Sequence, residues 1–332
     1  MTKRTPDVLV VGAGVAGLTT AICLAEQGLQ VDIRTRDVPR DTTSAAAGAI
    51  WGPHLVEKSD RVTRWSRETL AILTELANDP GTGVRAVSGM EAYHAVQDAP
   101  EWAPVLGGVT PCYDTELPPG FTSGWRYTAP VVSMRVYLDY LLSRFRSSGG
   151  DMEIAALTSL EQAAQDSPAP VIVNCTGIGA HSVVPDSSLS PVRGQVVIAE
   201  NPGIREFFIG LGDSCVYFFP HEDRLVLGGT EDRGNWSTQP DPQTASRILR
   251  ACADLDSRLD SLRVLEHRVG LRPVRPLVRL EAGGTTSASV AGRAQAGRLV
   301  MHNYGHGGSG VTLSWGCARE VTDVVLQALG TR

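Results

Sequence analysis

Three glycines near the N-terminus have the spacing of a turn that binds a dinucleotide. Gly12, Gly14 and Gly17 form the sequence GAGVAG. In such a turn the first glycine permits the bend, the second lets the backbone approach a pyrophosphate, and the third lets a helix pack on a strand. The pyrophosphate then lies at the helix N-terminus, where N–H groups and the helix dipole favour an anion. The alternative is a glycine turn with a purely structural role.

The sequence around these glycines favours the dinucleotide interpretation. Residues 8–11 form a continuous apolar run, as expected for a strand buried in a parallel sheet. Apolar residues recur at helical spacing over 18–26, Gly28 has the position of a C-cap glycine, and a second strand begins at 31–33. A glycine motif between a strand and a helix is the context that the fingerprint requires.

The end of the second strand leaves the identity of the dinucleotide open. The fingerprint asks there for Asp or Glu to hold a ribose hydroxyl. Thr35 and Arg36 stand at the strand end, whereas Asp32 lies within the strand and Asp37 beyond it. An arginine at this place suits the 2′-phosphate of NADP and equally the adenosine part of FAD.

Two further segments have small and hydroxylated residues that suit a cofactor loop. DTTSAAAGAIWGPH covers residues 41–54, and NCTGIGA covers residues 174–180. The alternatives without a ligand are a loop that caps a helix, for the first segment, and a strand-to-turn junction, for the second. In the functional interpretation, the first segment covers the pyrophosphate and flavin with hydroxyl and amide groups. The second lies where a crevice forms, outside the carboxyl ends of the strands.

A run of arginines and prolines has the character of a carboxylate clamp. In GLRPVRPLVRLE, Arg272, Arg275 and Arg279 alternate with Pro273 and Pro276. Arginines in such a strand are usually solvated. Prolines fix the direction of the backbone, however, so an inward arginine is held rigidly enough to bind a carboxylate through two hydrogen bonds.

Composition excludes several classes of function. The chain has 332 residues, is 42% hydrophobic and 20% charged, and is long enough for two domains. A net charge of −6 without a run of Lys and Arg argues against nucleic-acid binding. The six cysteines are scattered, which indicates a reducing compartment. No apolar run is long enough for a signal or a membrane span, so we expect a cytoplasmic protein without a membrane partner.

Metal and hydrolytic chemistry have little support in the sequence. The seven histidines are dispersed, there is no HExxH, and no cysteine or aspartate cluster has ligand spacing, so no metal site is predicted. A GxSxG nucleophile elbow is also absent.

Taken together, these segments resemble the D-amino-acid oxidase family of FAD flavoproteins, which includes the D-aspartate oxidases. The matching segments occur in the family's order along essentially the whole chain. They are VVGAGVAGL, TTSAAAG, VIVNCTG, RGQVV, YFFP, LGGTEDRGNW, GLRPVRPLVRLE and HNYGHGGSGVTLSWGCA. The chain is more similar to the D-amino-acid oxidases than to the D-aspartate oxidases, and the resemblance implies FAD as the cofactor.

The resemblance also implies roles for individual residues. Arg272 is similar to the arginine that pairs with the substrate carboxylate, Tyr217 to the tyrosine that binds the same group, and Gly308 to the glycine whose carbonyl receives the substrate amine. The implied FAD-binding positions are Gly12, Gly14, Ala16, Gly17, Arg36, Thr42, Thr43, Gly48, Ile50, Leu157, Cys175, Gly177, Gly307, Gly310, Val311 and Thr312.

The implied reaction is oxidative deamination of a D-amino acid. A hydride passes from the substrate Cα to flavin N5, the imino acid hydrolyses to a 2-oxo acid and ammonia, and O₂ is reduced to H₂O₂. Such a reaction needs accurate placement more than acid–base chemistry, so no side chain is assigned as a general base. The family also leads us to expect a homodimer.

Departures from the family pattern bear on the substrate. At the places of two arginines that D-aspartate oxidases use for the side-chain carboxylate, this chain has Gly210 and Glu231, although His54 resembles a histidine of that branch. A carboxylate near the pocket repels an acidic substrate. We therefore expect neutral and basic D-amino acids to be preferred. The alternatives are a D-aspartate oxidase, a glycine or secondary-amine oxidase, an NADP-dependent dehydrogenase and a silent flavin-binding protein.

The expected fold class is α/β with two domains. A discontinuous Rossmann-like FAD-binding domain is expected over residues 1–48, 136–184 and 282–332. Residues 49–135 and 185–281 are expected to form an α+β substrate domain with a mostly antiparallel sheet, and residues 51–130 show few clean periodicities. Helices are expected over 134–150, 241–255 and 311–329. The last would direct its N-terminus, near Thr312, at the flavin, and His302 and His306 are expected to be structural hydrogen-bonding residues.

Overall fold

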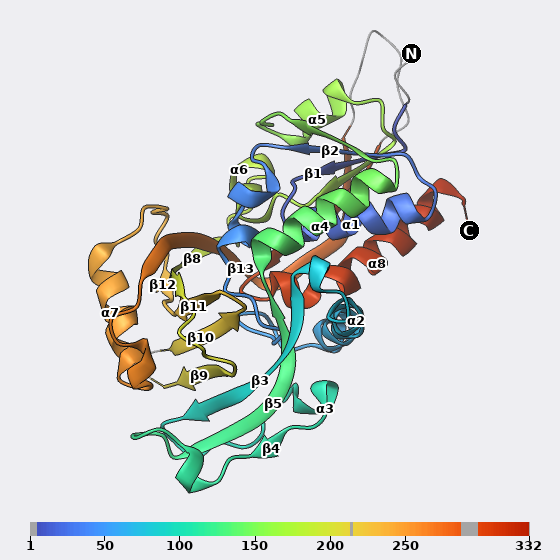
Figure 1. Ribbon diagram of the computed structural model, residues 1–332. Helices are drawn as coiled ribbons and strands as arrows, with labels where there is room; N and C mark the ends of the chain where they lie inside the picture. The colour runs from blue at the N-terminus through green and yellow to red at the C-terminus, as the bar shows by residue number, and fades with distance from the viewer. Residues whose placement is uncertain (1–4, 213–214, 287–297, 332) are drawn as a thin grey trace.

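A computed structural model describes residues 5–212, 215–286 and 298–331, with side chains left out at 284–286. A single sheet runs through this part of the chain in the order β4-β5-β3-β9-β10-β11-β8-β13-β14-β7-β1-β2-β6, and β12 pairs with β8 beside this path. Figure 1 shows the sheet continuing from one half of the molecule into the other.

One end of the sheet is parallel. Its strands are β14 (Arg298–His306), β7 (Val171–Asn174), β1 (Val8–Val11), β2 (Val31–Thr35) and β6 (Asp151–Ile154). The buried run VLVV of β1 lies between β2 and β7, as a fully apolar strand should in a parallel sheet. The carboxyl ends of β1, β2 and β7 therefore meet at one edge, which is where ligands bind in α/β sheets.

The other end of the sheet is mostly antiparallel, with β3 and β9 as its parallel pair. Its strands are β3 (Val84–Tyr93), β4 (Thr110–Pro111), β5 (Ser123–Val132), β8 (Ser190–Glu200), β9 (Phe207–Leu211), β10 (Val216–His221), β11 (Arg224–Gly228), β12 (Asp232–Arg233) and β13 (Val264–Thr286). β13 pairs with β8 along its first part and with β14 along its second part, so one strand joins the two ends of the sheet.

Helices cover both faces of the parallel end, and α7 covers one face of the antiparallel end. They are α1 (Val15–Glu26), α2 (Asp60–Leu76), α3 (Ala103–Leu106), α4 (Met134–Ser147), α5 (Leu160–Asp166), α6 (Ala180–Val183), α7 (Pro242–Ala253) and α8 (Gly310–Leu329). Short 3₁₀ turns lie at Pro39–Asp41, Thr43–Ala46, Pro80–Thr82, Asp114–Glu116, Gly177–Gly179 and Ser257–Leu259. In Figure 1, α1, α4 and α8 lie side by side, and α5 lies across the sheet from them. α7 packs its apolar face on strands β8, β10 and β11.

The expected α/β fold class is confirmed, and so are the helices predicted near 134–150, 241–255 and 311–329, as α4, α7 and α8. Helix α2 lies in the stretch for which the sequence predicted irregular or antiparallel structure. Ser59 caps it by accepting the N–H of Val62, and Val62, Trp65 and Leu73 are buried in the core that also holds α1 and α8. Residues 60–76 thus pack on the parallel end of the molecule, although the predicted boundaries place them in the substrate domain.

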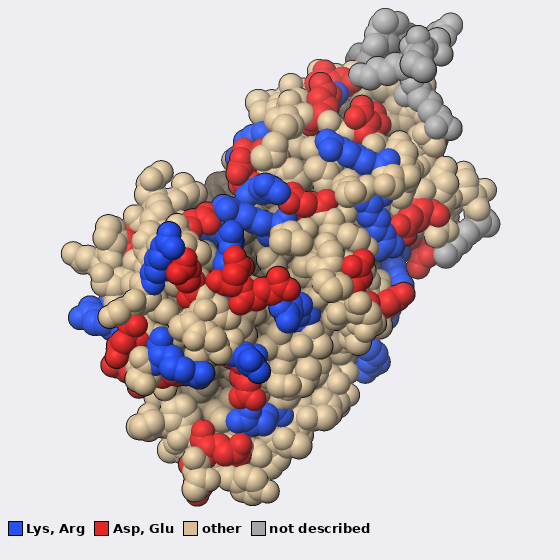
Figure 2. Space-filling view, in the orientation of Figure 1, with Lys and Arg blue, Asp and Glu red and all other residues tan. Residues whose placement is uncertain are grey.

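Charged side chains are mixed over the surface. Figure 2 shows Lys and Arg interspersed with Asp and Glu on the face that it presents. Surface pairs such as Arg40–Asp139 and Lys58–Glu101 account for part of this mixing. In the described part of the chain no helix has both the length and the apolar character needed to cross a membrane. Nor do the described residues contain a group of three or more His, Cys, Asp or Glu that could hold a metal ion.

A close helix crossing suggests a stability test. A Cβ at Gly316 of α8 would lie 2.3 Å from the Cα of Trp65 on α2, so Gly316→Ala must push two packed helices apart. Overpacking of this kind costs about 1–3 kcal/mol. Urea denaturation should show a loss of that size, whereas Gly52→Ala, at a site with no atom within 4 Å of the added Cβ, serves as the control. Equal stability of both variants would contradict the close crossing.

Candidate functional site

A cavity of about 350 Å³ lies at the carboxyl ends of β1, β2 and β7 and extends to strands β8, β10 and β13. Most residues expected to bind FAD line it: Gly12, Gly14, Ala16, Arg36, Thr42, Thr43, Gly48, Leu157, Cys175, Gly177, Gly307, Gly310 and Val311. Tyr217, Arg272 and Gly308 line the same cavity. Segments from five separate parts of the sequence therefore meet where the sequence predicted a cofactor beside a substrate.

Three of the expected FAD-binding residues do not line the cavity. Gly17 packs behind the turn, because a Cβ there would lie 1.9 Å from the carbonyl oxygen of Gly12. Ile50 forms an isolated β-bridge with Val131. The Thr312 hydroxyl donates to the carbonyl of Gly52 and accepts its N–H. In this structure each of the three supports the wall of the cavity.

The glycine turn fits a dinucleotide pyrophosphate. Gly12 has a φ of +108°, which favours glycine, and a Cβ at this position would lie 2.5 Å from the carbonyl oxygen of Cys175. A Cβ at Gly14 would lie 3.0 Å from Oγ of Ser44, which itself accepts the N–H of Val15 at 3.0 Å. Any side chain at Gly14 would enter this narrow cradle at the N-terminus of α1. The bare backbone leaves the space that an anion needs there.

Arg272 is held in a fixed position at the far end of the cavity. Its Nη1 donates to the carbonyl of Thr230 at 2.9 Å. Its guanidinium lies directly over Gly194 of β8, where a Cβ would come within 2.6 Å of the guanidinium carbon. A glycine under a planar cation lets the cation lie flat on the sheet. The guanidinium is thus oriented before any ligand arrives, which reduces the entropy lost on binding a carboxylate.

Tyr217 stands beside Arg272 and leans toward it. A Cβ at Gly228 would lie 2.3 Å from Cζ of the phenol, and one at Gly229 would lie 2.2 Å from Cε1, so the ring covers both glycines. Phe219 stacks on its other side, with ring centroids 4.6 Å apart. Burial raises the pKa of Tyr217 to about 12, against the opposing effect of the Arg272 charge. The phenol is therefore a neutral hydrogen-bond donor at pH 7.

An imidazole and a carboxylate face each other near Gly308, which lines the cavity. Nε2 of His54 lies 3.0 Å from Oε1 of Glu231, and a hydrogen bond from His54 lowers the pKa of Glu231 below its usual value. The backbone of His54 is fixed to the C-terminal loop, since its N–H donates to Ser309 Oγ and its carbonyl accepts from Gly308. A Cβ at Gly308 would lie 2.5 Å from the His54 ring. The pair thus joins the C-terminal loop to the segment that holds Arg272.

Gly210 does not face the cavity. It lies opposite Val216 on the neighbouring strand, and a Cβ there would meet Phe121 and Val216. Ile209, the residue before Gly210, pairs with Tyr217 and points to the same face of the sheet as Tyr217 does. Adjacent residues of a strand point to opposite faces, so Gly210 points to the other face. Of the two departures noted in the sequence, Glu231 alone bears on the charge of this site.

The two histidines of the C-terminal segment are buried and hydrogen-bonded. The Asn174 amide donates to Nδ1 of His302 at 3.3 Å, and Nε2 of His306 donates to Oδ1 of Asn303 at 3.0 Å. Burial lowers the pKa of each histidine to about 4. Both imidazoles are therefore neutral at pH 7 and add no charge to the cavity.

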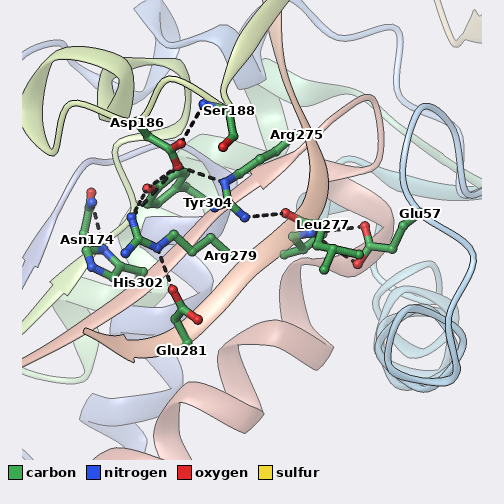
Figure 3. Close-up of polar contacts among 11 residues, drawn as sticks. Glu57, Asn174, Asp186, Ser188, Arg275, Leu277, Arg279, Glu281, His302 and Tyr304 are labelled. Carbon is green, nitrogen blue, oxygen red and sulfur yellow. Dashed lines mark hydrogen bonds and ion pairs between the residues drawn. The ribbon is translucent and has the colours of Figure 1, made fainter. Parts of the chain in front are cut away.

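Behind the cavity, Asp186 binds both arginines that follow Arg272 along β13 (Figure 3). Its Oδ2 accepts from Nε of Arg275 and from the Tyr304 hydroxyl, each at 2.8 Å, and Nη1 of Arg279 lies 3.9 Å away. Tyr304 in turn accepts from Arg279 at 2.7 Å. These bonds connect β13, β14 and the segment after α6 at the place where the register of β13 shifts.

The same network shapes the loop that carries Gly308. Gly305, directly after Tyr304, has a φ of +83°, and a Cβ there would meet the Arg275 side chain at 3.1 Å. Gly307 then donates its N–H to the carbonyl of Pro273. Burial favours the neutral form of Asp186, but hydrogen bonds from Tyr304, Ser188 and Arg275 prevail and lower its pKa below the usual value. Asp186 therefore supports the network as a carboxylate.

Sequence reasoning missed several residues that shape this site. Four such residues are Ser44, Gly194, Thr230 and Asp186. Ser44 lies beside Gly14, Thr230 binds Arg272 through its backbone carbonyl, and Gly194 makes room for Arg272 because it has no side chain. Asp186 binds Arg275, which lies far along the chain. Three of the four lie in segments that the resemblance to the family highlighted: Ser44 in TTSAAAG, Gly194 in RGQVV and Thr230 in LGGTEDRGNW. For Arg275 and Arg279 the sequence allowed either a solvated side chain or a carboxylate-binding role. In the structure both have a structural role, in the network around Asp186 and Tyr304.

Comparison with known proteins agrees with this geometry. Residues 7–324 match the family model described as FAD dependent oxidoreductase. The chain is similar to the D-amino-acid oxidase of Rubrobacter xylanophilus, with 44% identity, covering 97% of this chain and 96% of the relative. It is also similar to the D-amino-acid oxidase of Streptomyces coelicolor, with 42% identity and 96% of each chain covered. The cofactor is therefore FAD and not NADP, two possibilities between which Arg36 alone did not decide.

The fold is shared with more distant solved structures. The glycine oxidase of Geobacillus kaustophilus superposes with a TM-score of 0.78 at 19% identity, over 98% of this chain and 95% of the other. At this identity the likeness concerns the fold alone.

The Asp186 network gives a test with a pH signature. Asp186→Asn removes the charge that binds Arg275 and Arg279, and breaking a buried pair costs on the order of 3 kcal/mol. Because the folded pKa is lowered, the carboxylate stabilises the fold above its ordinary pKa of about 4 and loses that effect as pH falls below it. Urea denaturation should therefore show a deficit at pH 7 that shrinks toward pH 3.5. Asp139→Asn, at an exposed pair with Arg40, should stay close to wild type.

Proposed function

The chain belongs to the D-amino-acid oxidase family of FAD dependent oxidoreductases, and we propose that it oxidises neutral and basic D-amino acids to 2-oxo acids, with release of ammonia. The observation that carries this proposal is the fixed pair of Arg272 and Tyr217 in the cavity that the FAD-binding residues line. The names of the two bacterial relatives support the same activity.

Arg272 and Tyr217 bind the substrate carboxylate. The guanidinium presents a planar set of donors that matches a carboxylate, and one of these donors is already used by Thr230. The neutral phenol of Tyr217 adds a donor from the β11 side. Since Gly194, Gly228 and Gly229 carry no side chains, the carboxylate reaches both groups without obstruction.

Gly308 binds the substrate amine through its carbonyl. It is exposed at the cavity mouth and follows Gly307, so no side chain of this segment blocks the approach. With the carboxylate and the amine both held, the Cα–H bond has one orientation, and placement of this kind supplies most of the acceleration in such a reaction. FAD, when bound, supplies the acceptor for the hydride from Cα.

The N-terminus of α8 stabilises negative charge beside the cofactor. Gly310 and Val311 begin this 20-residue helix and line the cavity. The first N–H groups of a helix carry a partial positive charge. A reduced flavin is more negative than an oxidised one, so this helix favours the reduced state. No side chain is needed as a general base.

Glu231 sets the preference against acidic substrates. Its carboxylate lies near Arg272, whose charge contributes to lowering the pKa of Glu231, so it is ionised at neutral pH. A second carboxylate, brought by D-Asp or D-Glu, would meet a like charge in a partly desolvated site. Neutral and basic side chains meet no such repulsion.

Three further properties belong to this proposal. O₂ is the electron acceptor and H₂O₂ a product, as the family's name as oxidases supports. The protein acts in the cytoplasm, a location favoured by the free thiols of all six cysteines. It forms a homodimer, as the family resemblance suggests.

The proposed activity is tested with a panel of both enantiomers of the common amino acids in a peroxide-coupled assay. Neutral and basic D-amino acids should give a kcat/KM at least tenfold above that of D-Asp, and the L-enantiomers should be inactive. Arg272→Lys keeps the charge and loses the planar fork, so KM should rise about tenfold or more. The highest kcat/KM with D-Asp, or an unchanged KM in the variant, would refute the proposal.

Gly308→Val separates substrate binding from cofactor binding. The added side chain would enter the cavity mouth and collide with the His54 ring, 2.5 Å from the new Cβ. We expect KM to rise at least tenfold while the dissociation constant for FAD, measured by flavin fluorescence, changes less than threefold. Equal losses of substrate and FAD affinity would show that Gly308 lies against the cofactor.

A further inference from the structure

The face of the sheet that carries Tyr217 also carries a buried carboxylate, that of Glu91. Tyr217 on β10 lies opposite Ile209 on β9, and Ile209 lies opposite Glu91 on β3. Residues directly opposite each other on neighbouring strands point to the same face. Strands lie about 4.8 Å apart, so the Cα atoms of Tyr217 and Glu91 are separated by roughly 10 Å along this row.

The ring of Tyr217 leans away from Ile209. Its ring covers Gly228 and Gly229, which lie on the side of Arg272 and away from Glu91. Ile209 is partly exposed although its strand runs through the sheet interior. The row therefore begins at the carboxylate clamp, continues over an apolar floor and ends at the Glu91 carboxylate.

The Glu91 carboxylate has hydrogen bonds but no cation. The hydroxyl of Tyr127 donates to Oε2 at 2.8 Å, and the hydroxyl of Tyr93 donates to Oε1. The residue is 6% exposed, and within the described ranges no Lys or Arg forms an ion pair with it. Burial raises the pKa of Glu91 above its usual value, which the two tyrosines partly offset. A buried carboxylate without a counter-charge is costly to keep.

The charge of Glu91 acts on the same buried thiol as the charges of Glu231 and Arg272. The charges of Glu231, Arg272 and Glu91 all act on the pKa of the Cys215 thiol, which burial raises to about 12. The charge of His54 acts on Glu91 in turn. His54 contacts Glu231 at 3.0 Å, so Glu231 has its own partner. Of these two carboxylates, Glu91 is the one that lacks a cation.

On the basis of the proposed function, we propose that Glu91 is a specificity-determining residue that binds the distal ammonium or guanidinium group of a basic D-amino acid. With the substrate carboxylate on Arg272 and Tyr217, the four-carbon stem of a lysine side chain runs over Ile209 toward Glu91. The cation forms a charge-assisted hydrogen bond with the carboxylate. Tyr93, the less buried of the two tyrosines, yields its hydrogen bond to the cation, and Tyr127 keeps its own.

The test compares D-lysine with D-norleucine, which has the same carbon chain and no distal amine. The measured quantity is the ratio of their kcat/KM values in the FAD-loaded enzyme. Glu91→Gln, which keeps the shape of the side chain, should lower this ratio at least tenfold. Tyr93→Phe removes a neighbour of the carboxylate without removing the charge, so its ratio should equal or exceed that of wild type. Flavin absorbance and thermal unfolding confirm that each variant is folded and loaded.

The outcomes separate this inference from the proposed function. A ratio unchanged in Glu91→Gln, an equal fall for both substrates, or a wild-type enzyme that oxidises D-norleucine but not D-lysine would overturn the role of Glu91 and leave the oxidase activity intact. If the wild-type protein oxidises neither of them and no D-amino acid of the panel, the proposed function fails. Binding of both compounds, followed through the flavin spectrum, then decides: tighter binding of D-lysine that is lost in Glu91→Gln supports the inference, and equal binding overturns it.

Discussion

The shared use of one carboxylate, Asp186, is the interaction on which the rest of the site depends. β13 passes from the antiparallel end of the sheet to the parallel end, and its register shifts between Val274 and Arg279. At that shift the strand loses regular pairing, and Asp186 replaces it with bonds to Arg275 and Tyr304. Arg272, which we propose binds the substrate carboxylate, lies just before the shift, and the C-terminal glycines follow Tyr304 directly. The Asp186 carboxylate thus fixes the distance between Arg272 and the C-terminal glycines.

The site divides the work between rigid sheet and bare backbone. The side chains proposed to bind the substrate, Arg272 and Tyr217, stand on strands and lean on glycines of neighbouring strands. The glycine segments proposed to approach the cofactor and the substrate amine have buried flanking residues. Beside Arg272, the Glu231 carboxylate is held in place by its contact with His54. A reaction that needs accurate placement is well served by such an arrangement, because few of its parts are free to move.

The sequence predicted the parts whose physics is local. GAGVAG between a strand and a helix predicted the cofactor turn, and apolar spacing predicted α4, α7 and α8. Helix α2 was missed because proline and glycine residues near it hid a regular run in which Val62, Trp65 and Leu73 face one side. Asp186 had no signal at all, because its partner Arg275 is 89 positions away. The second and third arginines of the GLRPVRPLVRLE run could not be assigned from spacing, since only the fold reveals that Asp186 faces them.

The continuity of the sheet has a mechanical consequence. Two domains joined by flexible links can open and close as rigid bodies, but here β13 is hydrogen-bonded to β8 on one side and to β14 on the other. Swinging one half against the other would break ladder bonds along a strand that crosses both. Amino acids must therefore enter, and keto acids leave, by movement of surface segments around a stationary frame. Substitutions in those segments and in the outer strands can then change which side chains fit the pocket, while the positions of the reacting groups stay the same.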